Sequence, residues 1–168
     1  KSVASDHLAQ ALLFCGPRGV GKTTCARILA NVINGDANLT EEELALNIFE
    51  LDAASNNSVD DIRRLIDQVR FAPQTGKFKV YIIDEVHMLS QQAFNAFLKT
   101  LEEPPGHAIF ILATTEKHKI IPTILSRCQI FDFKRITVDD IAGHLAFVAE
   151  KEGVKAEPEA LHMIAEKA

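Results

Sequence analysis

Tryptophan is absent from this sequence, and tyrosine occurs once, methionine twice and cysteine three times. The formal net charge of −5 argues against a strongly basic DNA-wrapping surface, so any contact with nucleic acid must come from a local patch. Cys15, Cys25 and Cys128 show no paired CxxC spacing, which indicates buried free thiols in a reducing, intracellular protein. No apolar run approaches the roughly 18 residues that a membrane helix needs, and no signal-peptide pattern opens the chain.

Hydrophobic residues make up 47% of the 168 positions, enough for one sizeable core and the start of a second small domain. Short apolar runs, typical of parallel strands covered on both faces, alternate with amphipathic helical stripes. The runs are Ala11–Cys15, Ile48–Leu51, Val80–Ile83, Ile109–Ala113 and Ile130–Phe133, and the clearest stripes are Ile62, Leu65, Ile66, Val69 and Phe94, Phe97, Leu98, Leu101. This alternation predicts an α/β fold with an open parallel β-sheet flanked by helices.

The pattern changes after Lys134. Two helical segments follow, one beginning at Thr137 with Asp140 three residues later and one opened by Pro158. We therefore predict an α/β core at residues 1–134 and the beginning of a helical lid domain at 135–168. Because the chain starts at Lys1 and not at methionine, we expect it to be a piece of a longer protein. The polar stretch 35–43 is predicted to be a surface loop.

Residues 16–23 read GPRGVGKT, the G-x-x-x-x-G-K-[ST] pattern of a phosphate-binding loop. The pattern stands between a predicted strand and a helical stripe of Ala26, Ile28, Leu29 and Ala30, which is the context it requires. Its glycines let backbone N–H groups approach phosphate oxygens, and the following helix turns its positive end to the same anion. Lys22 is predicted to contact the β- and γ-phosphates, and Thr23 to bind Mg²⁺. The alternative is a glycine-rich turn with an incidental lysine.

We expect the loop and the first helical turn to bind ATP or ADP. The predicted nucleotide-binding residues are Gly16, Pro17, Arg18, Gly19, Val20, Gly21, Lys22, Thr23 and Thr24.

Polar residues follow two further apolar runs. Asp84 and Glu85 come directly after the run that ends at Ile83, where Asp84 can hold Mg²⁺ and Glu85 can polarise an attacking water. A solvated acidic strand end is the alternative. Thr115 closes another run, and its hydroxyl could bind the γ-phosphate or the water, although threonine is common at strand ends. His87 alone is as consistent with a structural as with a surface histidine, and Arg127 alone is more typical of a surface ion pair than of a catalytic group.

Taken together, these segments resemble one family. GPRGVGKT, ELDAASNNSVDDIR, VYIIDEVHMLS, FNAFLKTLEEPP, ILATT and SRC occur in this order. They resemble the gamma/tau subunits of the bacterial DNA polymerase III clamp loader, which are AAA+ ATPases. The resemblance covers nearly the whole chain, and DEVHML, LKTLEEPP and SRC are specific to proteins of the clamp-loader type.

The resemblance implies an ATPase that helps to open a sliding clamp and place it on primed DNA in the bacterial cytoplasm. It gives Lys22 and Thr23 the Walker A role, Asp84 and Glu85 the Walker B role, and Thr115 the sensor 1 role. Arg127 corresponds to an arginine finger that reaches the ATP site of a neighbouring subunit. The implied partners are other clamp-loader subunits, the sliding clamp and primer–template DNA, with no membrane.

DNA contact is expected through backbone phosphates, on the face formed by Asn56, Asn57 and Ser58 with Arg63 and Arg64. A solvated helix face is the alternative there.

Three family features are missing from the sequence: four zinc-binding cysteines before the second strand, the adenine-contacting N-terminal segment and a lid arginine. No zinc ligands are found at residues 34–48. Either the protein lacks the zinc module or a segment is missing between Asn34 and Gly35, and we expect the second, so zinc binding by the intact protein stays open. Two other functions compete with a motor. One is a non-hydrolysing AAA+ scaffold, which would need none of the Walker residues, and the other is a different AAA+ DNA motor such as a branch-migration helicase.

Overall fold

The computed structural model describes residues 9–35, 40–56 and 58–167, and the chain divides into two compact units, residues 1–133 and 134–168. The first unit is built on a five-stranded sheet with the order β2-β3-β4-β1-β5. Its strands are β1 (Ala11–Cys15), β2 (Ile48–Asp52), β3 (Lys79–Asp84), β4 (Ala108–Thr114) and β5 (Gln129–Asp132). Every pair of neighbouring strands is parallel, which confirms the predicted sheet.

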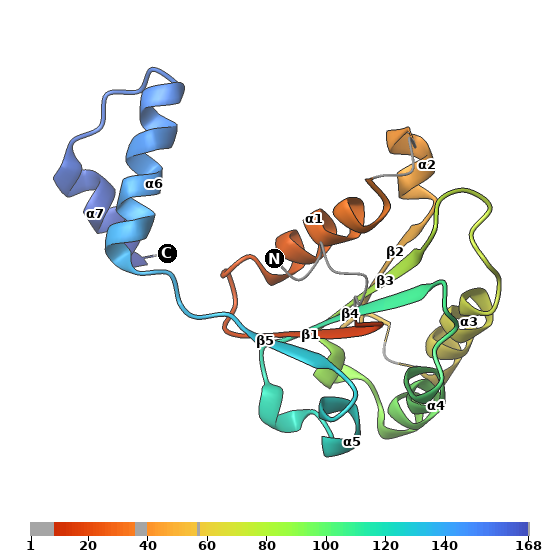
Figure 1. Cartoon of the computed structure of the whole chain (residues 1–168). Helices are drawn as coiled ribbons and strands as arrows, with labels where there is room; N and C mark the ends of the chain where they lie inside the picture. The colour runs from red at the N-terminus through yellow and green to blue at the C-terminus, as the bar shows by residue number, and fades with distance from the viewer. Residues whose placement is uncertain (1–8, 36–39, 57, 168) are drawn as a thin grey trace. The chain divides into compact units, whose positions relative to one another are not determined.

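Helices cover both faces of this sheet (Figure 1). Helix α1 (Lys22–Asn34) lies on one face, and α3 (Val59–Val69), α4 (Gln91–Glu102) and the short α5 (Pro122–Leu125) lie on the other. Serine caps begin two of them, since the hydroxyls of Ser58 and Ser90 accept backbone N–H groups three residues on. Ile28, which belongs to the predicted apolar stripe of α1, is 59% exposed, and the helix packs through Ala26 and Ala30 with Leu29 and Ile33 partly buried beside them.

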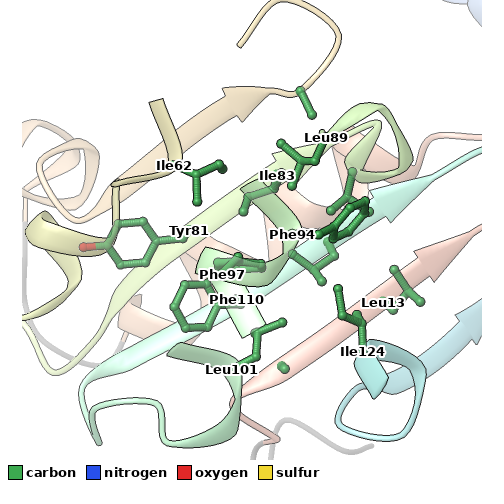
Figure 2. Close-up of a cluster of buried hydrophobic side chains, with 14 of the residues drawn as sticks. Leu13, Ile62, Tyr81, Ile83, Leu89, Phe94, Phe97, Leu101, Phe110 and Ile124 are labelled. Atoms are coloured by element: carbon green, nitrogen blue, oxygen red, sulfur yellow. The ribbon is translucent and has the colours of Figure 1, made fainter. Parts of the chain in front are cut away.

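Two cores result, because successive residues of a strand point to opposite faces. Leu13 of β1 belongs to the core under α3 and α4, whereas Leu12 belongs to the core under α1. Figure 2 shows the first of these cores, in which Phe97 meets Phe110 edge-on at 5.3 Å. Both faces of β3 and β4 are buried, but the edge strands β2 and β5 are only partly covered. The expectation that every strand is covered on both faces is therefore wrong at the two edges.

Residues 134–168 form the second unit, which consists of the contacting helices α6 (Val138–Lys151) and α7 (Pro158–Lys167). The Thr137 hydroxyl caps α6 by accepting from Asp140 N at 3.2 Å, and Pro158 opens α7. Val148, Met163 and Ile164 are exposed within this unit, and Ala165 is its buried apolar residue. A two-helix unit of this size buries little apolar surface by itself.

Two other predictions need correction. The stretch 35–43 is not a loop throughout, because α2 (Glu41–Ala45) begins there with a capping box between Thr40 and Glu43, while residues 36–39 lie outside the described residues. Cys25 is exposed and not buried, since it lies on the outer side of the first turn of α1. In the part of the chain that the structure describes, no helix is long and apolar enough to cross a membrane.

Candidate active site

The phosphate loop connects the carboxyl end of β1 to α1, between the neighbouring strands β4 and β5. Gly16 lies close to the backbone that follows β5, because a Cβ atom added to it would lie 2.4 Å from the carbonyl oxygen of Phe133. Gly21 occupies the N-cap position of α1 with φ of 85°, a conformation that favours glycine, and no side chain caps the helix. The first N–H groups of this 13-residue helix are therefore left for an anion.

Lys22 is the buried cation of the loop, with 6% of its surface exposed. Its Nζ donates to the carbonyl oxygens of Gly16 at 2.8 Å and Pro17 at 2.7 Å. A lysine in this position can exchange carbonyl partners for phosphate oxygens with a short movement of its chain, because an ammonium group has three rotatable donors. Of the other predicted loop residues, Arg18, Gly19 and Thr24 are exposed, and Pro17 and Val20 are half-buried.

Thr23 and Asp84 come together from α1 and the end of β3. The Thr23 hydroxyl donates to Asp84 Oδ2 at 2.5 Å, and Asp84 Oδ1 accepts from the backbone N–H of Glu85 at 2.8 Å. A hydroxyl paired with a carboxylate suits Mg²⁺, which commonly takes one or two protein ligands and completes its shell with phosphates and water. The two predicted metal ligands are therefore neighbours in the fold.

Glu85 has a strained backbone, with φ of 46° and ψ of 44°. It is the single non-glycine residue with positive φ in the part of the chain that the structure describes. Such a conformation costs about 1–3 kcal/mol and persists where surrounding contacts hold it. Here the contacts come from the residue that follows β4: Glu85 Oε2 accepts from Thr115 Oγ1 at 2.9 Å and from Thr115 N at 3.2 Å. The predicted general base and the predicted sensor residue are thus in direct contact.

Two residues beside Glu85 carry contacts that the motifs do not indicate. The His87 side chain is only 5% exposed, and its Nδ1 lies 3.0 Å from the hydroxyl oxygen of Thr114, which is buried in β4. Arg18 reaches the other side of the glutamate, with Nε 3.9 Å from Glu85 Oε1. A polar residue two places after an acidic pair, in an otherwise apolar segment, is the signal that could have identified His87.

Arg127 lies away from these groups. It precedes the first residue of β5, at the amino edge of the sheet, whereas the phosphate loop follows the carboxyl end of the parallel strand β1. Its guanidinium donates to Glu102 Oε1 at 2.9 Å and to the carbonyl oxygen of Thr123 at 3.0 Å. The ion pair expected of this arginine taken alone is therefore present, and the fold does not bring Arg127 to the site of its own chain.

The predicted DNA face is only partly suited to phosphate. Asn57 lies outside the described residues. Asp61 N is already bound by the Ser58 hydroxyl, and Asp60 and Asp61 add negative charge to the first turn of α3. Arg63 and Arg64 are exposed, with Arg63 3.5 Å from Asp60.

Among the side chains of residues 9–35, 40–56 and 58–167, no group of three or more histidines, cysteines or acids could hold a metal ion. Free Cys128 is half-buried, and burial raises the pKa of its thiol to about 11.

Comparison with known proteins places this arrangement in a family. The family described as DNA polymerase III, delta subunit, matches residues 1–137. The tau subunit of DNA polymerase III from Bacillus subtilis is 52% identical over 180 residues, covering 99% of this chain and 32% of that protein. The corresponding subunit from Escherichia coli is 46% identical, covering 96% of this chain and 27% of that protein. The chain thus spans about a third or less of these relatives, and the first alignment is longer than the chain itself.

Solved structures with less than 25% identity agree on the fold. A DNA polymerase III gamma-subunit-related protein of Thermotoga maritima has a TM-score of 0.66 at 24% identity, covering 85% of this chain and 48% of that one. The RuvB Holliday junction branch migration motor of the same organism has a TM-score of 0.68 at 24% identity, covering 93% and 48%. The α/β core is therefore a P-loop AAA+ fold, as predicted. The chain belongs to the DNA polymerase III, delta subunit family, and it is similar along nearly its whole length to tau and gamma subunits of that polymerase.

Proposed function

We propose that this chain contributes the ATP-binding and ATP-hydrolysing core of a clamp-loader subunit. The main observation in support is that five polar side chains converge at the carboxyl edge of one parallel sheet. This edge is where open α/β sheets bind their ligands. These side chains are Lys22, Thr23, Asp84, Glu85 and Thr115. In the proposed role, ATP is used to open a sliding clamp and to place it on primed DNA, in the bacterial cytoplasm.

The loop and the metal pair bind the nucleotide in this proposal. Lys22 leaves the carbonyls of Gly16 and Pro17 for the β- and γ-phosphates, and the uncapped start of α1 adds backbone N–H donors. Thr23 and Asp84 would hold Mg²⁺, which would supply positive charge to neutralise the phosphates. The Thr23 hydroxyl donates a hydrogen bond to the Asp84 carboxylate, so the two proposed ligands lie side by side.

Glu85 acts as the general base that orients and polarises the attacking water. Its carboxylate accepts two hydrogen bonds from Thr115, so its free lone pairs are concentrated on Oε1. Thr115 would then report the state of the site, because its hydroxyl can bind Glu85, the water or the γ-phosphate.

Arg127 serves a different site, that of the next subunit in the assembly. Its position at the amino edge of its own sheet supports action on a neighbour, as does its side chain, which is 36% exposed beside Glu102. The partners in this proposal are other clamp-loader subunits, the sliding clamp and the phosphates of primer–template DNA. Zinc binding by a longer form of the protein stays a prediction that rests on the resemblance.

A non-hydrolysing scaffold fits the observations less well. It needs neither a buried lysine under the loop carbonyls nor a glutamate held in a strained conformation by a neighbouring strand. A branch-migration motor shares the fold, but a likeness at 24% identity shows the fold alone. The high identity to tau subunits therefore favours the clamp-loader role.

The test compares ATP turnover by the full-length protein in its reconstituted assembly, with and without sliding clamp and primer–template DNA. We expect clamp and DNA together to stimulate turnover. Glu85→Gln should retain nucleotide affinity and reduce turnover by about 10²–10⁴-fold, because an amide cannot accept the proton of the water. Glu42→Gln, an exposed position on α2, is the matched control. Turnover that ignores clamp and DNA, or that survives Glu85→Gln, would contradict the proposal.

A further inference from the structure

His87 is an enclosed polar side chain at the edge of the candidate site. It lies on the 3-10 turn Val86–Met88 that follows β3, and 5% of its side chain is exposed. Burying an imidazole among apolar neighbours is unfavourable unless its nitrogens find partners. The partners here come from the carboxyl ends of β3 and β4 and the residues that follow them.

Each ring nitrogen faces an oxygen. Nδ1 lies 3.0 Å from Thr114 Oγ1 and 3.3 Å from Glu85 Oε2, and Nε2 lies 3.5 Å from Glu116 Oε1. Thr114 Oγ1 in turn accepts from the backbone N–H of Glu116 at 3.0 Å. The ring is therefore fixed from the β4 side, and its Nδ1 edge is turned towards the glutamate.

The group that Nδ1 faces distinguishes His87 from an ordinary buried histidine. Thr114 and Glu116 would suffice to satisfy the ring, yet Nδ1 also approaches Oε2, the same oxygen that accepts two hydrogen bonds from Thr115. Its other carboxylate oxygen, Oε1, has Arg18 at 3.9 Å. Contacts on one oxygen from two directions restrict rotation of the carboxylate and leave the second oxygen for other partners.

We propose that His87 is a positioning residue for ATP hydrolysis, acting through Glu85. Thr114 holds the ring, the ring and Thr115 hold Oε2, and Oε1 is thereby presented to the attacking water. The inference rests on the proposed function, since it assigns His87 a role in the reaction of that same site. His87 touches neither nucleotide nor water in this account, so nucleotide affinity does not depend on it.

The test uses the full-length protein in its assembly. His87→Ala should lower kcat by about 10–100-fold, as is usual when the partner that orients a reacting group is removed, with KM and nucleotide affinity unchanged. His87→Asn places an amide nitrogen where Nδ1 stands and should restore much of the rate, whereas His87→Gln, which reaches the Nε2 position, should restore less. His118→Ala is the matched control, because this 76%-exposed histidine lies 3.6 Å from the same Glu116.

Two further measurements separate positioning from a structural role. In a Glu85→Gln background, His87→Ala should cause no additional loss of turnover, because residues that act as a unit are not additive. A nucleotide-free crystal structure of His87→Ala should show the Glu85 carboxylate displaced from the Thr115 hydroxyl, independently of any activity.

Distinct outcomes overturn each proposal. An assembly that hydrolyses no ATP at all would remove the proposed function. An active assembly in which His87→Ala keeps the normal kcat, or loses rate equally in the Glu85→Gln background, would overturn the role of His87. Equal rates for His87→Asn and His87→Gln, with Glu85 still bound to Thr115 in the His87→Ala crystal, would overturn it as well.

Discussion

The two edges of the parallel sheet differ in what their charged side chains contact within the same chain. At the carboxyl edge, Lys22, Asp84 and Glu85 each make hydrogen bonds with neighbouring groups of this edge. The amino edge carries Arg127, which is paired with Glu102 at the end of α4. The four residues of β5 separate the two edges by about 13 Å at roughly 3.3 Å per residue.

In the proposed function, this difference corresponds to a division of labour between binding and hydrolysis. The carboxyl edge would supply the groups that bind the nucleotide. Charge that develops on the transferred phosphoryl group would call for a further cation, and Arg127 lies at the opposite edge of its own sheet. Substitutions at the two edges should therefore affect the ATP sites of different subunits. Assemblies that mix altered and unaltered subunits can test this difference.

The largest expected effect comes from Arg127→Ala in one position of a mixed assembly. A finger supplied by a neighbour accelerates hydrolysis by about 10³–10⁵-fold, so turnover at the adjacent site should fall by that order. Nucleotide binding to the altered subunit itself should stay close to normal. The measurement follows turnover at each site separately, with Arg135→Ala as an exposed control. If the altered subunit's own site fails while its neighbour's stays normal, Arg127 acts in cis and the two edges are not divided in this way.

A smaller effect is expected from Lys22→Ala at the carboxyl edge. A hydrogen bond to a charged group contributes about 1.5–3 kcal/mol, so the affinity for Mg–ATP should fall by about 10–100-fold in the altered subunit alone. Titration calorimetry on the full-length protein measures this directly. Lys77→Ala removes an exposed lysine of the same unit and should leave affinity unchanged. Unchanged affinity in Lys22→Ala would mean that the buried lysine only stabilises the loop.

A third prediction concerns the surface between the edges. Arg63→Ala and Arg64→Ala on α3 should weaken DNA binding by the assembly equally across sequences, and each should reduce the salt slope by about 1 if it contacts a phosphate. The pair of Arg63 with Asp60 lowers the expectation for that residue, so Arg64 should show the larger change. Arg70→Ala, exposed beyond the end of the same helix, is the control. A salt slope that no substitution alters would place the DNA track elsewhere.

Local sequence signals predicted most of the strands and the phosphate loop. Apolar runs located each strand to within one or two residues at its ends, and the loop motif is continuous, so that its chemistry depends on neighbours in the chain. The short helix that begins at Glu41 was not predicted, because the surrounding stretch is polar. Its Thr40–Glu43 capping box is nevertheless visible in the sequence. Ile28 does not share the packed face of α1, which consists of Ala26 and Ala30 with Leu29 and Ile33 beside them.

Contacts between strands were harder to predict. Glu85 meets Thr115 and His87 meets Thr114 because β3 and β4 are neighbours in the order β2-β3-β4-β1-β5, and periodicity does not specify that order. The left-handed backbone of Glu85 has no sequence signal either, because the strain is held by tertiary contacts. Tyr81, inside β3, makes further contacts of this kind with Phe49 of β2 and Phe110 of β4.

The smallest expected effect is that of Tyr81→Phe, deep in the sheet and away from both edges. Tyr81 is fully buried and stacks between Phe49 at 5.0 Å and Phe110 at 5.5 Å, as Figure 2 shows in part. Its hydroxyl has no hydrogen-bond partner within the described part of the chain, and burial raises its pKa to about 12. Removing an unsatisfied buried hydroxyl while keeping the ring should raise the free energy of unfolding by up to about 1 kcal/mol. Because the folded-state pKa is raised, Tyr81 keeps its proton in the folded state and loses it more readily on unfolding, so its contribution to stability is lost as pH rises from about 10 to 12. Urea unfolding at pH 7 and pH 11 should therefore show a larger advantage of Tyr81→Phe at pH 11, and a variant less stable than the wild type at both values would mean that the hydroxyl has a partner that stabilises the core.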